Sequence, residues 1–161
     1  MISRDRDAAG RARNDRPRDR LGRPLPPGSA GVARIPDDLE LGPQQTLAFA
    51  QQLLDDGLAF NAHEVLEAAW KNGPVAERML WQGLAQYAVG ITHLQRGNSK
   101  GAVTLLRRAS GRLDDYPANA QQHEVDRAGL IAHARILLAA VEAGATITDD
   151  QLRPRLRREP T

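Results

Sequence analysis

The feature that most constrains the fold is a long apolar repeat between residues 75 and 96. One row of apolar side chains is spaced by four, three, four and three residues: Leu80, Leu84, Tyr87, Ile91 and Leu94. This spacing places the row on one face of an α-helix. An adjacent row is apolar as well: Trp81, Ala85 and Ala88. A helix with two apolar rows is expected at the centre of a bundle, where neighbouring helices cover both rows.

Four shorter amphipathic segments are predicted to form the other helices. They cover residues 46–55, 61–71, 99–114 and the stretch from 127 up to Gly144. Asn61 is the expected N-cap of the second segment, with Glu64 as its capping-box partner, and Asp126 is the expected N-cap of the last. Short connections join antiparallel neighbours. The sequence therefore predicts an all-α fold, a compact antiparallel bundle of about five helices without strands.

Charge and composition divide the chain into three parts. Residues 1–35 are rich in Arg, Pro and Gly and poor in apolar side chains, which predicts a disordered leader. Residues 36–146 carry the helical pattern and are predicted to be the bundle domain. Residues 147–161 are predicted to be an Arg-rich tail after a short turn. The chain is thus expected to be one domain with a basic extension at each end.

The basic leader raises the question of nucleic-acid binding. Residues 1–36 contain nine Arg and four Asp, a net charge of +5. The remaining thirteen basic and sixteen acidic residues leave the rest of the chain at −3. Asp residues interrupt the leader's charge, no aromatic side chain is present there to stack on bases, and the bundle adds no second basic surface. A solvated leader is therefore favoured, and nucleic acid is not expected as a partner.

The composition also excludes several classes of protein. The chain has no cysteine, so disulfides, thiolate metal sites and a cysteine nucleophile are excluded. No apolar run approaches the roughly 18 residues that a membrane-spanning helix needs. The charged N-terminus has no hydrophobic signal core. A cytoplasmic location is expected, and any metal would be bound by His, Asp or Glu.

A candidate site lies on the predicted second helix. His63 and Glu67 are four residues apart, so they share a face, and Trp70 lies on the same side. Glu64 is turned away from that face. A polar row on the central helix, opposite its leucine row, offers partners within about 40° of one another: Gln82, Gln86 and His93. His123 and His133 have no partner in this pattern and are expected at the surface.

Two interpretations of these residues stay open. In the first, His63, Glu67 and His93 hold a divalent metal, with Zn, Mn or Fe as candidates, and Glu64 acts as general base on a bound water. In the second, His63 and Glu67 form a structural hydrogen-bonded pair with the glutamines, and Glu64 caps its helix. Spacing alone does not separate them, because two residues four apart on a helix are common in both.

Three blocks of sequence resemble one known family. Residues 60–70 (FNAHEVLEAAW), 81–86 (WQGLAQ) and 93–98 (HLQRGN) occur in the same order in domain-of-unknown-function family 309, and the resemblance covers roughly residues 50–142. It implies a small all-helical bundle. It also implies that His63, Glu67, Gln82 and His93 converge on one site. Members are often labelled metal-dependent hydrolases, a label that rests on the His/Glu motif rather than on an established reaction.

Two functions follow as expectations from different classes. The first is a metal-dependent hydrolase-like enzyme built on the His/Glu site. The second is a non-catalytic helical interaction module in which the His, Glu and Gln side chains form a buried structural network. Residues 75–114 resemble a single helical hairpin of the tetratricopeptide type, and repeat arrays need about three. A protein partner or a second copy of the chain is the expected ligand of such a module.

Overall fold

The structure is a computed structural model and describes residues 17–158. This part contains, in chain order, α1 (Pro43–Asp55), α2 (Ala59–Asn72), α3 (Arg78–Gln95), α4 (Ser99–Asp115) and α5 (Arg127–Glu142). A 3₁₀ turn, η1 (Val75–Glu77), precedes α3. Between residues 17 and 158 no strand forms, and the extended pairing consists of two isolated bridges.

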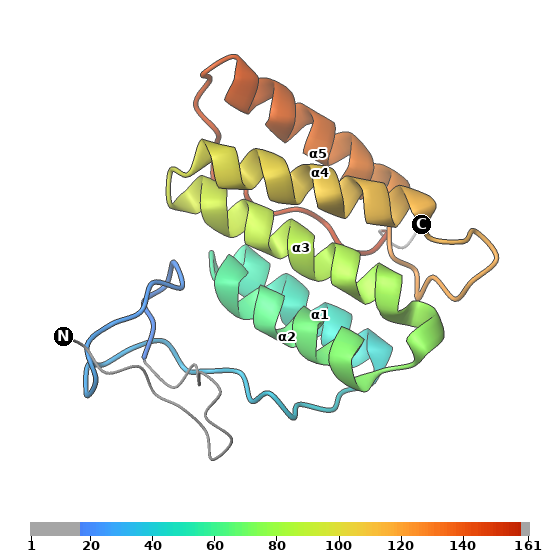
Figure 1. Ribbon diagram of the computed structural model, residues 1–161, viewed down its shortest axis with the longest axis horizontal. Helices are drawn as coiled ribbons and strands as arrows, with labels where there is room; N and C mark the ends of the chain where they lie inside the picture. Colours follow the sequence, from blue (N-terminus) through green and yellow to red (C-terminus); the bar gives the residue numbers. More distant parts are fainter. Residues whose placement is uncertain (1–16, 159–161) are drawn as a thin grey trace.

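The helices pack in the order in which they follow along the chain. Each helix contacts the next one, and α3 lies between α2 and α4 (Figure 1). Most of the apolar row of α3 is fully buried, with no exposed surface at Leu80, Leu84 or Ile91, and Leu94 at its end is partly buried. The prediction of an all-α antiparallel bundle with the 75–96 segment at its centre is therefore confirmed.

The helix boundaries differ from the sequence pattern at two places. α2 begins at Ala59, so Asn61 lies inside the helix and is not its N-cap. The cause is the tight turn at Gly57 (φ +77°), which returns the chain directly into helix and makes Leu58 the capping position. The predicted capping box of Asn61 and Glu64 was therefore wrong. The Asp126 cap is confirmed, because its Oδ1 accepts a hydrogen bond from the Gly129 amide at 3.0 Å.

An N-terminal segment, residues 17–42, lies against α2 and the end of α3 before the chain enters α1 (Figure 1). Arg96 Nε donates to the Leu21 carbonyl at 2.8 Å, and Asn61 Nδ2 donates to the Ala33 carbonyl at 3.1 Å. Arg20 donates in turn to the Asp56 carbonyl. In the first two of these hydrogen bonds the acceptor is a backbone carbonyl group of the segment. A pattern of hydrophobic side chains gives no information about backbone hydrogen bonds, so these contacts could not be predicted from it. The boundary between leader and bundle stays a prediction, and residues 1–16 lie outside the described part.

A C-terminal segment, residues 147–158, packs against α1 and the loop before α5. The Gln51 side chain accepts from the Leu156 amide at 2.8 Å and donates to the Pro154 carbonyl at 2.9 Å. The Leu156 side chain is 1 % exposed and belongs to the core. Arg155 adds an ion pair to Asp55 at 2.8 Å. The described part of the predicted tail therefore contributes to packing of the bundle.

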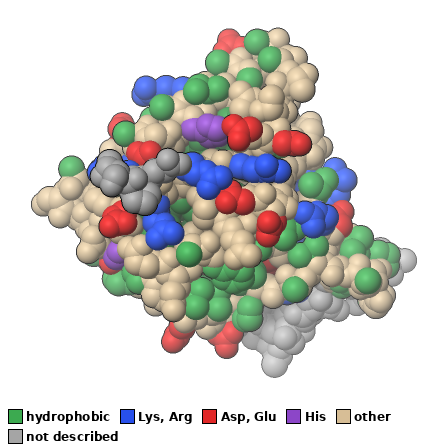
Figure 2. Space-filling view, turned by 180° about the vertical axis from the view of Figure 1, so that it is seen from behind, with side chains coloured by type: hydrophobic (Ala, Val, Ile, Leu, Met, Phe, Trp, Pro, Cys, Tyr) green, Lys and Arg blue, Asp and Glu red, His purple; other side chains and the backbone are tan. Residues whose placement is uncertain are grey.

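The surface mixes charges of both signs. On the face shown in Figure 2, Lys and Arg side chains lie beside Asp and Glu side chains, and hydrophobic side chains gather below them. This face therefore offers no continuous basic surface among the described residues. Over the same residues, none of the helices combines the length and the apolar character that crossing a membrane requires.

Candidate functional site

The His63–Glu67 pair forms as the spacing predicts, and it extends to a third side chain. His63 Nε2 lies 2.9 Å from Glu67 Oε2, and Lys71 Nζ lies 2.6 Å from Glu67 Oε1. The hydrogen bond from His63 holds the pKa of Glu67 down at about 2, with a smaller contribution from Lys71 and against the effect of burial. The three residues occupy one face of α2 at successive turns, and we call them the α2 ladder.

The imidazole of His63 is engaged through both of its nitrogens. Nδ1 lies 3.2 Å from the carbonyl oxygen of Phe60, one turn earlier in the helix, while Nε2 faces Glu67. Both neighbours are acceptors, so both hydrogen bonds exist together only when each nitrogen carries a hydrogen. In this arrangement the ring offers no lone pair to an ion.

Glu64 lies apart from the ladder. Its Oε2 is 3.9 Å from Arg34 Nη2 in the N-terminal segment, and its side chain is 12 % exposed. Burial raises the pKa of Glu64, and the nearby charges of Arg34 and His63 partly offset that rise. The carboxylate therefore pairs with the N-terminal segment, and its role as general base stays a prediction.

The polar row of α3 faces a different neighbour from the one expected. Gln86 Oε1 accepts from Arg112 Nε of α4 at 3.0 Å. His93 Nδ1 lies 3.1 Å from Asn98 Nδ2, at the N-terminus of α4. Burial, together with the charge of Arg96, lowers the pKa of His93. These two side chains thus serve the contact between α3 and α4, whereas the ladder lies on α2.

The other predicted site residues have structural surroundings. Trp70 is half-buried against the core, with Lys71 Nζ 5.8 Å from its ring centroid. Gln82 is half-buried on α3 beside Gly83, which packs closely on Leu113 of α4. Across residues 17–158, no group of three His, Asp or Glu side chains lies close enough to hold a metal ion.

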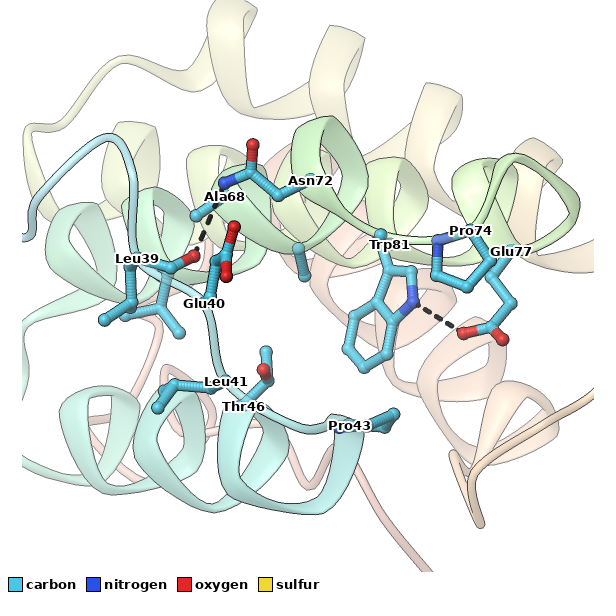
Figure 3. Close-up of a pocket in the computed structure, with 13 residues that line it drawn as sticks. Leu39, Glu40, Leu41, Pro43, Thr46, Ala68, Asn72, Pro74, Glu77 and Trp81 are labelled. Carbon is cyan, nitrogen blue, oxygen red and sulfur yellow. Dashed lines mark hydrogen bonds between the residues drawn. The ribbon is translucent and has the colours of Figure 1, made fainter.

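A pocket of about 270 Å³ lies along the C-terminal half of α2, between that helix, the start of α3 and residues 39–43. Figure 3 shows the ring of Trp81 on one side of the hollow and the carboxylate of Glu40 on another. The remaining lining is mostly apolar or small: Leu39, Leu41, Pro43, Thr46, Val65, Ala68, Ala69, Gly73 and Pro74. Polar groups come from Glu40, Asn72 and Glu77. The lining is thus of mixed character, and a concave surface that combines apolar side chains with placed polar groups can receive a ligand.

One wall of this pocket is fixed by a hydrogen-bonded cluster that sequence reasoning missed. Glu77 Oε1 accepts from Trp81 Nε1 at 3.2 Å and lies 2.7 Å from His123 Nε2. The His123 ring lies 5.8 Å from the Trp81 ring, and its side chain is only 12 % exposed. We call these three residues the Glu77 cluster.

The expectation that His123 and His133 have no partner was wrong for both, and each is partly buried. His133 Nε2 is 2.7 Å from the Gln151 carbonyl. His123 reaches Glu77 from a loop in which His123 and Glu124 both have positive φ, at 51° and 65°. No periodic signal exists in a loop, and the partners are 46 residues apart, so the sequence pattern offered no way to find this contact.

Comparison with known proteins finds a relative that is itself uncharacterised. An uncharacterised protein of Bacillus subtilis (strain 168), YpuF, is 35 % identical over 79 residues, which is 48 % of this chain and 42 % of YpuF. The chain thus matches less than half the length of that relative. No solved structure matches. The family match is shorter than the resemblance over residues 50–142 suggested, and it includes the α2 ladder but not His123. Residues 47–105 of this chain match the model of the domain of unknown function DUF309.

Proposed function

We propose that this protein is a non-catalytic helical interaction module, and that the pocket beside Trp81 receives part of a partner protein. The observation that carries the proposal is the pocket itself, a formed concavity whose lining combines apolar side chains with the polar groups of Glu40, Asn72 and Glu77. Two exposed apolar side chains belong to the same region. Leu41 lines the pocket and is 37 % exposed, and Val75, which directly follows the lining residue Pro74, is 74 % exposed. Exposed apolar side chains around a hollow favour a docking role.

In this proposal the α2 ladder is structural. Both oxygens of Glu67 are occupied by side chains of its own helix, and both nitrogens of His63 face oxygens. Such pairs between successive turns stabilise a helix by roughly 0.3–0.5 kcal/mol each. The ladder therefore supports the helix that forms the pocket floor.

The alternative, a metal-dependent hydrolase, needs more than the ladder provides. A catalytic metal site typically takes three protein ligands and leaves a position for water. His63 and Glu67 could turn toward an ion, but His93 is bonded to Asn98 and Glu64 is paired with Arg34. The hydrolase function therefore has support only from the spacing of His63 and Glu67.

Metal analysis and melting of the full chain distinguish the two functions, with wild type beside His63→Ala. A structural ladder predicts no stoichiometric Zn, Mn or Fe and no metal-dependent melting shift, with the variant less stable by about 1 kcal/mol or less. Bound metal at one equivalent, with a melting shift that His63→Ala abolishes, would favour the hydrolase. Binding of short peptides at the pocket, followed by NMR of the ¹⁵N-labelled chain, tests the docking role directly.

A further inference from the structure

The charge of the pocket indicates which kind of partner it selects. We propose that it binds a peptide of a partner protein through one arginine or lysine side chain flanked by apolar residues, an inference that rests on the docking function proposed above. Two charged residues line the pocket, Glu40 and Glu77, and both are acidic. No Lys, Arg or His is among the described lining residues, and His123 contacts Glu77 from outside the pocket.

The tryptophan favours the same ligand. The Trp81 ring borders the hollow in Figure 3, and its only hydrogen-bond donor, Nε1, is already bonded to Glu77. Trp81 is 2 % exposed, so it offers a ligand only the small part of its ring that borders the hollow, and the π-electrons of that ring attract a cation rather than an anion. The ring and the two carboxylates thus favour the same sign of charge.

The Glu77 cluster keeps one of these carboxylates in place. Trp81 Nε1 and His123 Nε2 both meet Oε1 of Glu77, whereas Oε2 has no hydrogen bond to any described residue. The carboxylate is thus oriented before a ligand arrives, which reduces the ordering cost of binding. Glu40 is exposed on the opposite side and is free to close on the ligand.

The size and lining of the pocket suit one long side chain. Its volume of about 270 Å³ lies below the roughly 300–1,000 Å³ of pockets that hold drug-sized molecules. Val65, Ala68 and Ala69 form an apolar floor from α2. Arginine and lysine bury an aliphatic stem on such a surface while the charged end reaches polar groups. A flanking apolar residue of the peptide would meet Leu41, which lines the pocket and is exposed.

The test is a titration of the ¹⁵N-labelled full chain, followed through the indole N–H signals of its two tryptophans. The probe is acetyl-Ala-Leu-Arg-Leu-Ala-amide, and its control carries citrulline, a neutral isostere, in place of arginine. We expect the arginine peptide to shift the Trp81 signal and to bind about fivefold tighter than the citrulline peptide, while Trp70 serves as internal reference. Glu40→Gln should weaken binding about threefold, and Glu142→Gln, exposed at the end of α5, should not.

Each other outcome has a definite meaning. Equal binding of the two peptides at Trp81 would overturn the cation preference and leave the docking function standing. A Trp81 signal unmoved by either peptide at millimolar concentration would overturn both. Methylguanidinium alone, if it bound as tightly as the arginine peptide, would identify a site for small cations and overturn the peptide partner.

Discussion

Replacing Gly22 by alanine should detach the N-terminal segment while leaving the helical bundle folded. Gly22 has φ of +77°, a conformation that costs an alanine roughly 1–2 kcal/mol. A Cβ at this position would also overlap the ring of Phe60, well inside van der Waals contact. Overpacking of this kind costs about 1–3 kcal/mol, so the two effects together reach about 2–5 kcal/mol.

Gly28 provides a matched control in the same segment. Its φ is +84°, but a Cβ there would meet no atom within 4 Å. Gly28→Ala therefore carries the backbone cost without the clash. The difference between the two variants isolates the contact with Phe60.

Hydrogen exchange measures the effect directly. The amides of Leu25 and Val32 are bonded to the Pro17 and Arg18 carbonyls within the segment. We expect Gly22→Ala to lower their protection at least about tenfold below that in Gly28→Ala, with amides inside α3 unchanged, because local opening does not require global unfolding. Equal protection in both variants, or no protection of these amides in the wild type, would refute the argued packing of Gly22 on Phe60.

Three further predictions concern the ladder, the pocket wall and the C-terminal segment. The folded-state pKa of Glu67, about 2, lies below its ordinary value of 4.5, so its stabilisation is present above about pH 4.5 and is lost as the pH falls toward 2. Denaturant melts should show Glu67→Gln less stable than wild type by about 1 kcal/mol at pH 6, after allowance for solvent screening, and nearly equal at pH 2. His123→Ala should leave Glu77 without one partner and lower the unfolding free energy by about 1–3 kcal/mol. It should also change the fluorescence of Trp81, whereas the control His133→Ala should leave that fluorescence unchanged. Leu156→Ala should cost about 2–4 kcal/mol in chemical denaturation, because that side chain is buried in the core, and a cost below 0.5 kcal/mol would mean that the C-terminal segment does not pack as described.

The parts of the fold that were predictable are those in which periodicity and burial coincide. The apolar row of α3 identified the central helix because a helix covered on two sides needs apolar side chains on two sides. The Asp126 cap was predictable because its hydrogen bond to Gly129 is local. The contact between His63 and Glu67 was predictable because it too is local, joining two residues that are one helical turn apart.

The neighbouring helix that a given helix face contacts was not predictable from the same pattern. Gln86 and His93 share a side of α3, as turn arithmetic requires, but that side meets Arg112 and Asn98 of α4. A helical wheel fixes angles within one helix and says nothing about which neighbour lies opposite. The contacts made by His123 and by Gln51 were equally out of reach, since each joins a loop or an end to a helix through polar atoms.

The position of the family match bears on how such a module would choose its partner. Residues 47–105 include the pocket floor on α2 and the wall at Glu77 and Trp81. Leu39, Glu40 and Leu41, which complete the rim, precede the matched region, and His123, which holds Glu77, follows it. In the docking proposal, the matched region supplies most of the hollow, while the segments before and after it complete the lining and hold Glu77 in place. Exchanging residues 39–41 should then change which peptide binds while leaving the fold and the Glu77 cluster intact.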